Sequence, residues 1–268
     1  AEFGGVARDG GDVGRHVDGD AQRIGKLVWL LFLKIWDDRE LEAEALDPDY
    51  VSPLVNVRWR VGNREKVEKD LRWRSWAANP EGMTGEELLG FVNDTLFPAL
   101  KNLDLGSPVE GTSKKVRAAE ALRARRALIH SVFEDAYQYM KSGTLLRQVI
   151  NKTQGSIDFN DSKSRHLFGE IYETLLRDLQ SAGNAGEYYT PRAVTQFAVD
   201  MIDPQLGEVI LDPACGTGGF LACSIEHLRK QVGTPSDEQR LQASIRGGEK
   251  KPLPHLLCTT NMIVHGID

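Results

Sequence analysis

The residues best suited to bind a ligand lie in one short glycine-rich segment, Asp-Pro-Ala-Cys-Gly-Thr-Gly-Gly, at positions 212–219. The segment follows an apolar run, 209–211, that is typical of a buried strand, and it precedes residues 220–231, which we expect to form a helix. Glycines permit a tight turn and let a ligand approach the backbone closely. Because ligands bind beyond the carboxyl ends of the strands in open parallel sheets, we expect residues 212–219 to form a ligand-binding turn.

Two acidic residues indicate which ligand this turn would bind. Asp212 ends the strand, where its carboxylate would repel a pyrophosphate but suit a cation such as the ammonium group of a methionine moiety. Glu249 follows a second expected strand, 244–247, and its carboxylate could accept hydrogen bonds from both hydroxyls of a ribose. No Gly-Lys-Ser/Thr follows the glycines, so the segment is not a P-loop. The glycine pattern alone would also fit a tight connection that binds no ligand.

The elements around the turn are typical of the beginning of a parallel α/β sheet. A strand, a loop, a helix and then a second strand and helix follow one another, as they do where helices cover a parallel sheet. A loop, 181–192, would lead into a helix with Pro191 near its first turn. The other expected elements are helices at 163–180, 220–231 and 252–264, strands at 209–211 and 244–247, and a polar connection at 233–242.

The preceding residues are predicted to form a separate, mainly helical domain, 1–152, with a loop-like arm at 1–19 that lacks an apolar period. Its first helix would begin after Asp20 and end before Asp47-Pro48, and Thr84 with Glu87 forms a capping-box pattern. The expected helices are 21–45, 85–100, 113–140 and 145–150, with a turn at 62–63 and an interruption at Gly155. The predicted fold class is therefore α plus α/β, with a helical N-terminal domain followed by a Rossmann-like parallel-sheet domain, 153–268.

The composition narrows the class of protein. Hydrophobic residues make up 41% and charged residues 27%, as in soluble globular proteins, and the net charge of −6 means that nucleic acid could be bound only through a local basic face or a partner. Three cysteines without Cys-x-x-Cys spacing indicate neither a disulfide framework nor zinc, which fits a reducing cytosol. The longest apolar run, 27–35, is too short to span a bilayer. We expect a cytoplasmic protein with no metal site and no membrane contact.

Two basic segments leave alternatives open. Residues 114–126 form a basic stretch on an expected helix, which suits either a DNA-facing or partner-facing surface or a solvated helix face. Residues 58–76 interleave arginine with tryptophan, which suits either contact with a phosphate backbone or tryptophans that anchor an irregular segment to the core.

Four blocks in this order resemble one protein family. DPACGTGGF (212–220) is similar to the cofactor motif of adenine-N6 DNA methyltransferases, and GEYYTPRAV (186–194) is similar to the segment that precedes it. EKKPLPHLLCTTNMIVHGID (249–268) and VDGDAQRIGKLVWLLFLKIWDDRE (17–40) resemble the modification (M) subunits of type I restriction-modification systems. The resemblance implies S-adenosyl-L-methionine as cofactor and methyl transfer to adenine in double-stranded DNA. It implies as partners a specificity subunit, a second modification subunit and, in the larger complex, a restriction subunit.

The resemblance also implies roles for individual residues. Thr190 would contact the cofactor carboxylate, Asp212 would face the methionine amine and Glu249 would hold the ribose. The full set of expected cofactor-binding residues is Glu187, Tyr188, Tyr189, Thr190, Pro191, Arg192, Asp212, Gly216, Thr217, Gly218, Gly219 and Glu249. Core packing is an equal alternative for Tyr188 and Tyr189. Cys215 is expected to fit under the cofactor rather than to act as a nucleophile.

The sequence departs from the family in its catalytic motif. Related enzymes hold a flipped-out adenine with Asn or Asp followed by Pro-Pro and an aromatic residue, and no such tetrapeptide occurs in these 268 residues. We expect it to lie beyond Asp268, so we predict no catalytic residue in this chain and no methyl transfer by the chain alone. The competing hypotheses are a non-catalytic partner-binding module with a degenerate cofactor site and a methyltransferase that acts on RNA or protein.

Overall fold

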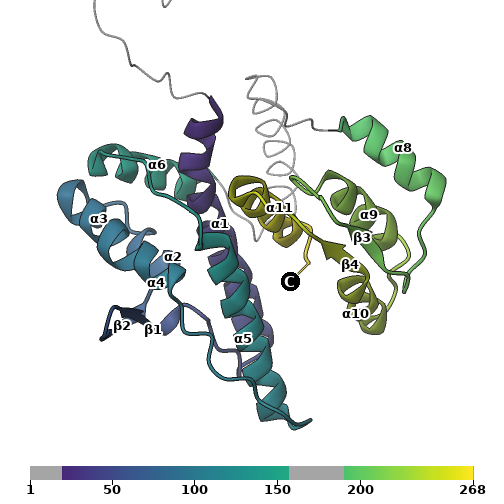
Figure 1. Cartoon of the computed structure of the whole chain (residues 1–268), viewed down its shortest axis with the longest axis horizontal. Helices are drawn as coiled ribbons and strands as arrows, with labels where there is room; N and C mark the ends of the chain where they lie inside the picture. Colours follow the sequence, from purple (N-terminus) through teal and green to yellow (C-terminus); the bar gives the residue numbers. More distant parts are fainter. Residues whose placement is uncertain (1–19, 157–189, 268) are drawn as a thin grey trace, which may run out of the picture.

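The computed structural model describes residues 20–156 and 190–267, which form a mainly helical N-terminal region beside a smaller α/β region (Figure 1). This arrangement confirms the predicted fold class. The arm expected at 1–19 and the helix expected at 163–180 lie outside the described residues, and the division of the chain after residue 152 stays a prediction. Among the described helices, none is both long and apolar enough to cross a membrane.

The long helix α1 (Asp20–Leu46) runs through the N-terminal region and carries much of its core. It ends just before Asp47-Pro48, as predicted, because proline cannot continue a helix and restricts the residue before it. The predicted apolar stripe is buried at Val28, Phe32, Ile35 and Trp36, but Leu31 is only partly buried. Burial also extends to the other faces of the helix, since Trp29, Leu30 and Leu33 are buried as well.

A β-hairpin follows α1. Strands β1 (Val55–Val61) and β2 (Arg64–Asp70) pair antiparallel around the two-residue turn that the sequence predicted, where Gly62 has a φ of +58°. The sequence predicted the turn but not the strands. The reason lies in β2, whose residues are mostly exposed and charged and therefore show no alternation of apolar and polar residues. The short helix α2 (Trp73–Trp76) comes next, and both of its tryptophans are buried.

Several helix boundaries differ from the predictions. Helix α3 (Gly85–Phe91) continues through a π-helical segment (Val92–Leu96) into α4 (Phe97–Lys101), but the Thr84 side chain makes no cap hydrogen bond, so the predicted capping box is wrong. Helix α5 (Lys114–Phe133) ends well before residue 140, where the Gln138 side chain bonds both backbone groups of Met140 and so competes with helical bonding. Helix α6 (Gly143–Ser156) passes through Gly155, which lies in its last turn and does not interrupt it.

The α/β region contains α8 (Arg192–Ile202), β3 (Ile210–Asp212), α9 (Gly219–Arg229), α10 (Pro235–Ser244), β4 (Ile245–Gly247) and α11 (Pro252–Val264). Strands β3 and β4 pair in parallel, with Asp212 opposite Gly247, which confirms both predicted strands. The polar connection expected at 233–242 is wrong, since α10 occupies most of it. Thr234 begins α10 with a capping box to Asp237, and Leu241 is its buried apolar anchor.

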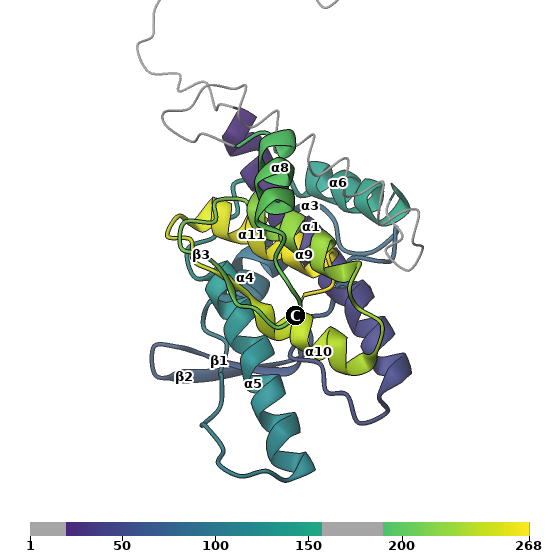
Figure 2. The ribbon, with the colours of Figure 1, turned by 90° about the vertical axis from the view of Figure 1, so that its right-hand side faces the viewer.

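Helix α11 joins the two regions. It packs against α1 and α5, and its residues Leu256, Leu257 and Ile263 belong to the same core cluster as the apolar residues of α1 (Figure 2). Its other contacts are with α9, and Cys258 and Met262 pack beneath the turn that follows β3. The carboxyl ends of β3 and β4 are therefore fixed relative to the helical region.

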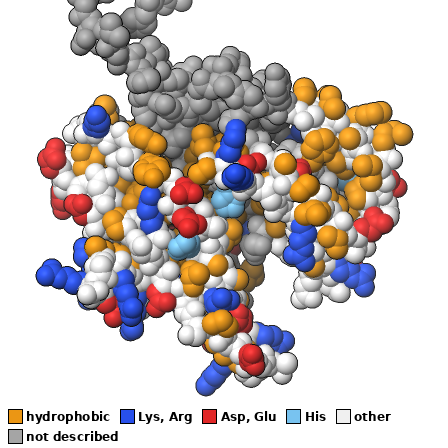
Figure 3. All heavy atoms as spheres, in the orientation of Figure 1, with side chains coloured by type: hydrophobic (Ala, Val, Ile, Leu, Met, Phe, Trp, Pro, Cys, Tyr) orange, Lys and Arg blue, Asp and Glu red, His pale blue; other side chains and the backbone are white. Residues whose placement is uncertain are grey.

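The other side of β3 is open among the described residues. Within this part of the chain β3 pairs only with β4, and Leu211 on β3 is 66% exposed. Helix α8 beside it exposes Phe197, Met201 and Ile202, each by 65% or more. The region of α8 and β3 lies at the right in Figure 1, and hydrophobic side chains gather on that side of the surface in Figure 3. We call this surface, formed by α8 and the free edge of β3, the open edge.

Candidate cofactor-binding site

The turn after β3 is bonded to the chain that follows β4. The backbone N–H of Cys215 donates to the carbonyl of Gly248, and the N–H of Gly248 donates to the carbonyl of Asp212, both over 2.9 Å. Within the turn, the N–H of Gly218 donates to the carbonyl of Cys215 over 2.8 Å and so leads the chain into α9. These bonds hold the two strand ends in one crevice, where parallel sheets bind ligands.

The two acidic residues singled out in the sequence lie at this same crevice. Oε2 of Glu249 accepts a hydrogen bond from the N–H of Gly216 over 3.0 Å, and Oε1 accepts one from the N–H of Lys251 over 2.7 Å. Oδ1 of Asp212 accepts from the N–H of Ala214 over 3.2 Å. Both carboxylates are half-buried. Each oxygen of Glu249 has a second lone pair, so the carboxylate can accept hydroxyl groups without losing its backbone bonds.

Two glycines of the turn have backbone conformations that other residues rarely adopt, with φ of +55° at Gly216 and +84° at Gly218. A Cβ atom at Gly218 would lie 2.9 Å from Sγ of Cys258 and 3.0 Å from Cε of Met262. A Cβ atom at Gly216 would have no atom within 4 Å, so open space lies beside Gly216 and next to the Glu249 carboxylate. Gly218 is thus required by packing, whereas Gly216 borders space that a ligand could enter.

Cys215 points below the turn, where its Sγ lies 3.6 Å from Sγ of Cys258. Both side chains are buried with Leu221 in one small cluster. The hydrogen bond with Cys258 lowers the pKa of Cys215, while the same bond and burial raise the pKa of Cys258. Cys215 therefore serves as a small packing residue beneath the turn.

Of the other predicted residues, Thr217 lies in the glycine turn and Gly219 is the first residue of α9. Thr190, Pro191 and Arg192 lie where α8 begins. Thr190 and Pro191 precede α8, and Pro191 is its N-cap residue. The guanidinium of Arg192 donates to Oε2 of Glu226 on α9 over 2.6 Å, so its charge is directed to α9. Glu187, Tyr188 and Tyr189 lie outside the described residues.

Glu226 and His265 are site residues that sequence reasoning missed. Nε2 of His265 lies 3.1 Å from Oε1 of Glu226, and this bond together with Arg192 lowers the pKa of Glu226 to about 2 despite partial burial. Both residues stand on helices without a recognisable spacing to the glycine turn, so no sequence signal marked them.

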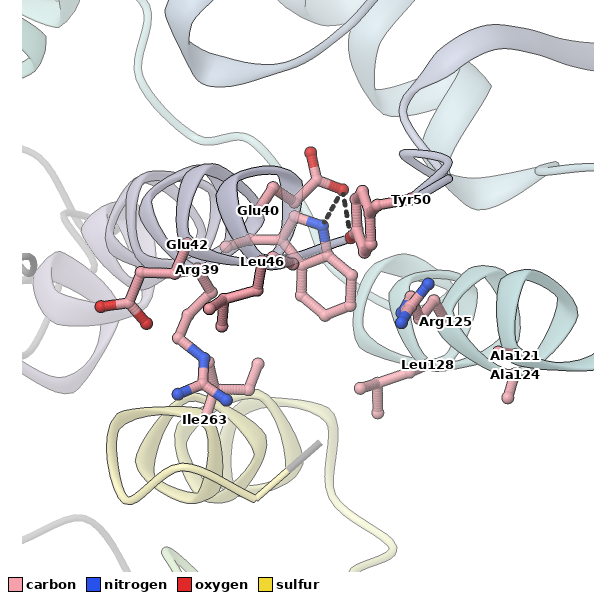
Figure 4. A pocket seen from close by; sticks show the side chains of 12 residues that line it. Arg39, Glu40, Glu42, Leu46, Tyr50, Ala121, Ala124, Arg125, Leu128 and Ile263 are labelled. Carbon is pink, nitrogen blue, oxygen red and sulfur yellow. Dashed lines mark hydrogen bonds between the residues drawn. The ribbon is translucent and has the colours of Figure 1, made fainter. Parts of the chain in front are cut away.

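Two cavities differ in character and share no lining residue. One, of about 270 Å³, opens between α8, β3 and α9, and Asp212 is its one acidic lining residue among apolar neighbours that include Phe220. The other, of about 630 Å³, lies between α1, α5 and α11 (Figure 4). Beside it the carboxylate of Glu40 accepts from Trp36 and Tyr50, and burial raises the pKa of Glu40. Only the first cavity adjoins the glycine turn.

The structure narrows the alternatives for the basic segments. In segment 58–76 all three tryptophans are buried, and Arg72 and Arg74 are paired with Asp70, Glu44 and Asp37, so this part anchors the chain. Arg58 and Arg60 are instead exposed and line a hollow of about 550 Å³ together with Lys101 and His130. The hairpin that carries them lies at the lower left, where Lys and Arg side chains gather in Figure 3.

On the basic helix α5, several side chains are used within the molecule. Lys114 pairs with Asp49 over 2.5 Å, the guanidinium of Arg125 lies 4.5 Å from the centre of the Tyr50 ring, and Arg126 donates to the carbonyl of Asp104. This surface is therefore partly neutralised, which favours a structural role over a DNA-facing one.

Comparison with known proteins gives matches along the whole described chain. Residues 15–153 match the family model of the HsdM N-terminal domain, and residues 163–268 match that of the N-6 DNA Methylase. The EcoEI methylase subunit of a type I restriction enzyme from Escherichia coli is 56% identical over 253 residues, which are 94% of this chain and 46% of that one. The StySPI methylase subunit from Salmonella potsdam is 27% identical over 256 residues, 91% of this chain and 39% of that one.

Two solved structures share the arrangement. A modification subunit of a putative type I restriction enzyme from Vibrio vulnificus YJ016 matches with a TM-score of 0.71 and 40% identity over 94% of this chain and 50% of that one. A chain from a structure of type I R-M complex assembly and conformational transition matches with a TM-score of 0.66 and 33% identity, over 93% and 45% respectively. The chain spans about half the length of these relatives.

Proposed function

The chain belongs to the family of type I restriction-modification methylase (M) subunits, and on this basis we propose that it binds S-adenosyl-L-methionine for methylation of adenine at N6 in DNA. The observation that carries the proposal is the hydrogen bond between Glu249 and the N–H of Gly216. It brings the acid after β4 to the glycine turn after β3, which is the geometry needed to bind a nucleoside across two parallel strands.

The residues present fit this cofactor. Asp212 supplies a carboxylate for the methionine ammonium, and the free lone pairs of Glu249 can accept both ribose hydroxyls. The open space beside Gly216 leaves room for the nucleoside. When bound, the cofactor would supply a methyl group on a positively charged sulfur, ready for transfer to an amine. The work of these residues is to bind and orient the cofactor, because the tetrapeptide that holds adenine is not among the 268 residues.

The substrate and partners follow from the same family. We propose that double-stranded DNA is the substrate and that a specificity subunit, a second modification subunit and a restriction subunit complete the complex. Arg58, Arg60 and Lys101 line a hollow outside the cofactor site, which they share with Glu65 and Asp104, and the exposed Arg58 and Arg60 can contact a phosphate backbone. A net charge of −6 means that such local cations, rather than the chain as a whole, must attract DNA.

Calorimetry with two ligands tests the cofactor assignment. S-adenosylmethionine contains both a ribose and a methionine, whereas adenosine contains only the ribose. Glu249→Gln should weaken binding of both ligands, by roughly 10- to 100-fold, because it removes charge-assisted hydrogen bonds to the hydroxyls. Asp212→Asn should weaken binding of S-adenosylmethionine but not of adenosine.

Glu208→Gln is the matched control, since Glu208 is exposed and bonds only to the N–H of Gln205 among the described contacts. It should leave both affinities unchanged. If the wild-type chain releases no heat with S-adenosylmethionine, or if Glu208→Gln and Glu249→Gln behave alike, the assignment is wrong and a non-catalytic partner-binding module becomes the better description.

A further inference from the structure

A continuous chain of hydrogen bonds connects the glycine turn to the start of α8. The side-chain amide of Asn261 on α11 donates to the carbonyl of Thr217 in the turn over 3.2 Å. One helical turn later, Nδ1 of His265 lies 2.9 Å from the carbonyl oxygen of Asn261. Nε2 of His265 meets Glu226 over 3.1 Å, and Glu226 accepts from Arg192 over 2.6 Å. We call these five residues the relay.

His265 connects α11 to α9 through both of its ring nitrogens. Both ring nitrogens face groups that only accept hydrogen bonds, a backbone carbonyl and a carboxylate. The Glu226 carboxylate lies between His265 and the Arg192 guanidinium, and its bonds to both lower its pKa.

The ends of the relay are the two segments that the family resemblance assigns to the cofactor. Thr217 belongs to the turn after β3, and Arg192 directly follows Thr190 and Pro191. Among the described residues, the hydrogen bonds and ion pairs do not join these segments directly, and the α8–α9 contact lies between them. The relay spans that contact and also ties both to α11, which is fixed on the helical region.

We propose that Asn261, His265 and Glu226 are positioning residues that hold the glycine turn and the Thr190–Arg192 segment in register, so that the methionine end of the cofactor meets both at once. This inference rests on the proposed function. It predicts that the two segments are interdependent, so that a change at one end of the relay loosens the other.

Hydrogen exchange of the 268-residue chain without ligand tests the coupling itself. Glu226→Gln is nearly isosteric but replaces the carboxylate that accepts from Arg192 and contacts His265 with a neutral amide, and His265→Gln removes one of the two ring bonds. Each should increase amide exchange at residues 194 and 195, whose N–H groups donate to the carbonyl of Pro191, and at residues 214–218 of the glycine turn. Two variants are used so that one remains informative if the other reduces the circular dichroism signal of the folded chain.

His227→Gln is the matched control. His227 also stands on α9 and bridges to carboxylates near α8, Asp203 over 3.0 Å and Asp200 over 3.5 Å, but it is no member of the relay. It should leave exchange of the 214–218 amides unchanged. Increased exchange confined to the neighbourhood of each substituted residue, or an equal effect of His227→Gln, would overturn the proposal.

A double-substitution cycle on cofactor affinity separates the relay from the proposed function. Among the described hydrogen bonds, Arg192 and Asn261 have different partners, Glu226 and Thr217. If the two sites were unconnected, the loss of the double variant Arg192→Met with Asn261→Ser would equal the product of the single losses within about two-fold. The relay predicts losses of roughly 3- to 10-fold for each variant alone and a clearly smaller loss than the product for both. Coupled exchange without any cofactor binding would support the relay and refute the proposed function. Cofactor binding with losses that multiply in the double variant would support the proposed function and refute the relay.

Discussion

Gly218 occupies the position in the turn where an added methyl group would collide with α11. Its φ of +84° is unfavourable for alanine, and a Cβ atom there would lie 2.9 Å from Sγ of Cys258. Gly218→Ala should therefore lower the free energy of unfolding through two independent costs. Gly216→Ala is the matched comparison, because its φ is +55° but its Cβ would meet no atom within 4 Å.

The magnitudes follow from these two geometries. A left-handed conformation costs a residue other than glycine about 1–2 kcal/mol. Forcing a methyl group into a filled space costs about 1–3 kcal/mol more. Gly216→Ala should therefore lose about 1–2 kcal/mol of unfolding free energy, and Gly218→Ala about 2–5 kcal/mol. Adding Cys258→Ala to Gly218→Ala should recover part of the difference, since it removes the closest obstructing atom.

Urea unfolding followed by far-ultraviolet circular dichroism measures these differences. Tryptophan fluorescence is the wrong probe, because all 5 tryptophans precede residue 77 and report the helical region. The comparison depends on the difference between the two glycine variants, which cancels the backbone cost. Equal midpoints for Gly216→Ala and Gly218→Ala would show that the turn is not packed against α11 as described.

Three further predictions concern stability and binding. Arg147→Ala should lower the free energy of unfolding by about 2–4 kcal/mol in the same urea assay. The reason is that the buried guanidinium donates to four backbone carbonyls, those of Trp76, Ala77, Asn79 and Met83. A loss below about 1 kcal/mol would contradict this prediction. The pKa of Glu226 is lowered from 4.5 to about 2, so the ionised side chain stabilises the fold fully above pH 4.5 and loses this effect as the pH falls through about 2. The urea midpoint of Glu226→Gln should therefore change less between these pH values than that of the wild type. Parallel pH profiles of the two proteins would refute this prediction. Arg58→Gln combined with Arg60→Gln should reduce the salt dependence of duplex binding, measured by fluorescence anisotropy, by a slope of about 2, whereas the exposed Arg240→Gln should not.

The elements that sequence patterns predicted well are those with a clear apolar run and a clear end signal. Helix α1 is mostly apolar over residues 27–36 and ends before a proline. Strand β3 was predicted correctly as a strand, but Leu211 is 66% exposed, so the expectation that the strand is buried was wrong for the described residues. Helix α10 was not predicted, because Leu241 is its main buried apolar residue and one such residue gives no apolar period. Thr234 and Asp237, which form the capping box at its start, were the signal that could have indicated it. The hairpin strand β2 was not predicted, because its charged residues are exposed on both faces and the sequence shows no alternation of apolar and polar residues.

The candidate site was predictable only in part, for a similar reason. Asp212, Gly216 and Glu249 each follow a strand, and parallel pairing brings strand ends together, so their meeting could be expected from local patterns. Glu226 and His265 meet because α9 and α11 cross, which depends on how three helices pack. Arg192 was expected to line the cofactor, and no pattern along the chain indicated that its charge would be directed to α9.

The open edge has a practical consequence for handling this polypeptide. Within the described ranges 20–156 and 190–267, this edge of β3 has no strand partner and is bordered by Leu211, Phe197 and Ile202, so a second molecule can add its own edge there. Concentrated samples of the 268-residue chain should therefore self-associate, with light scattering that rises with protein concentration. Leu211→Lys should suppress this self-association, because a charged lysine on an edge strand opposes the addition of another strand.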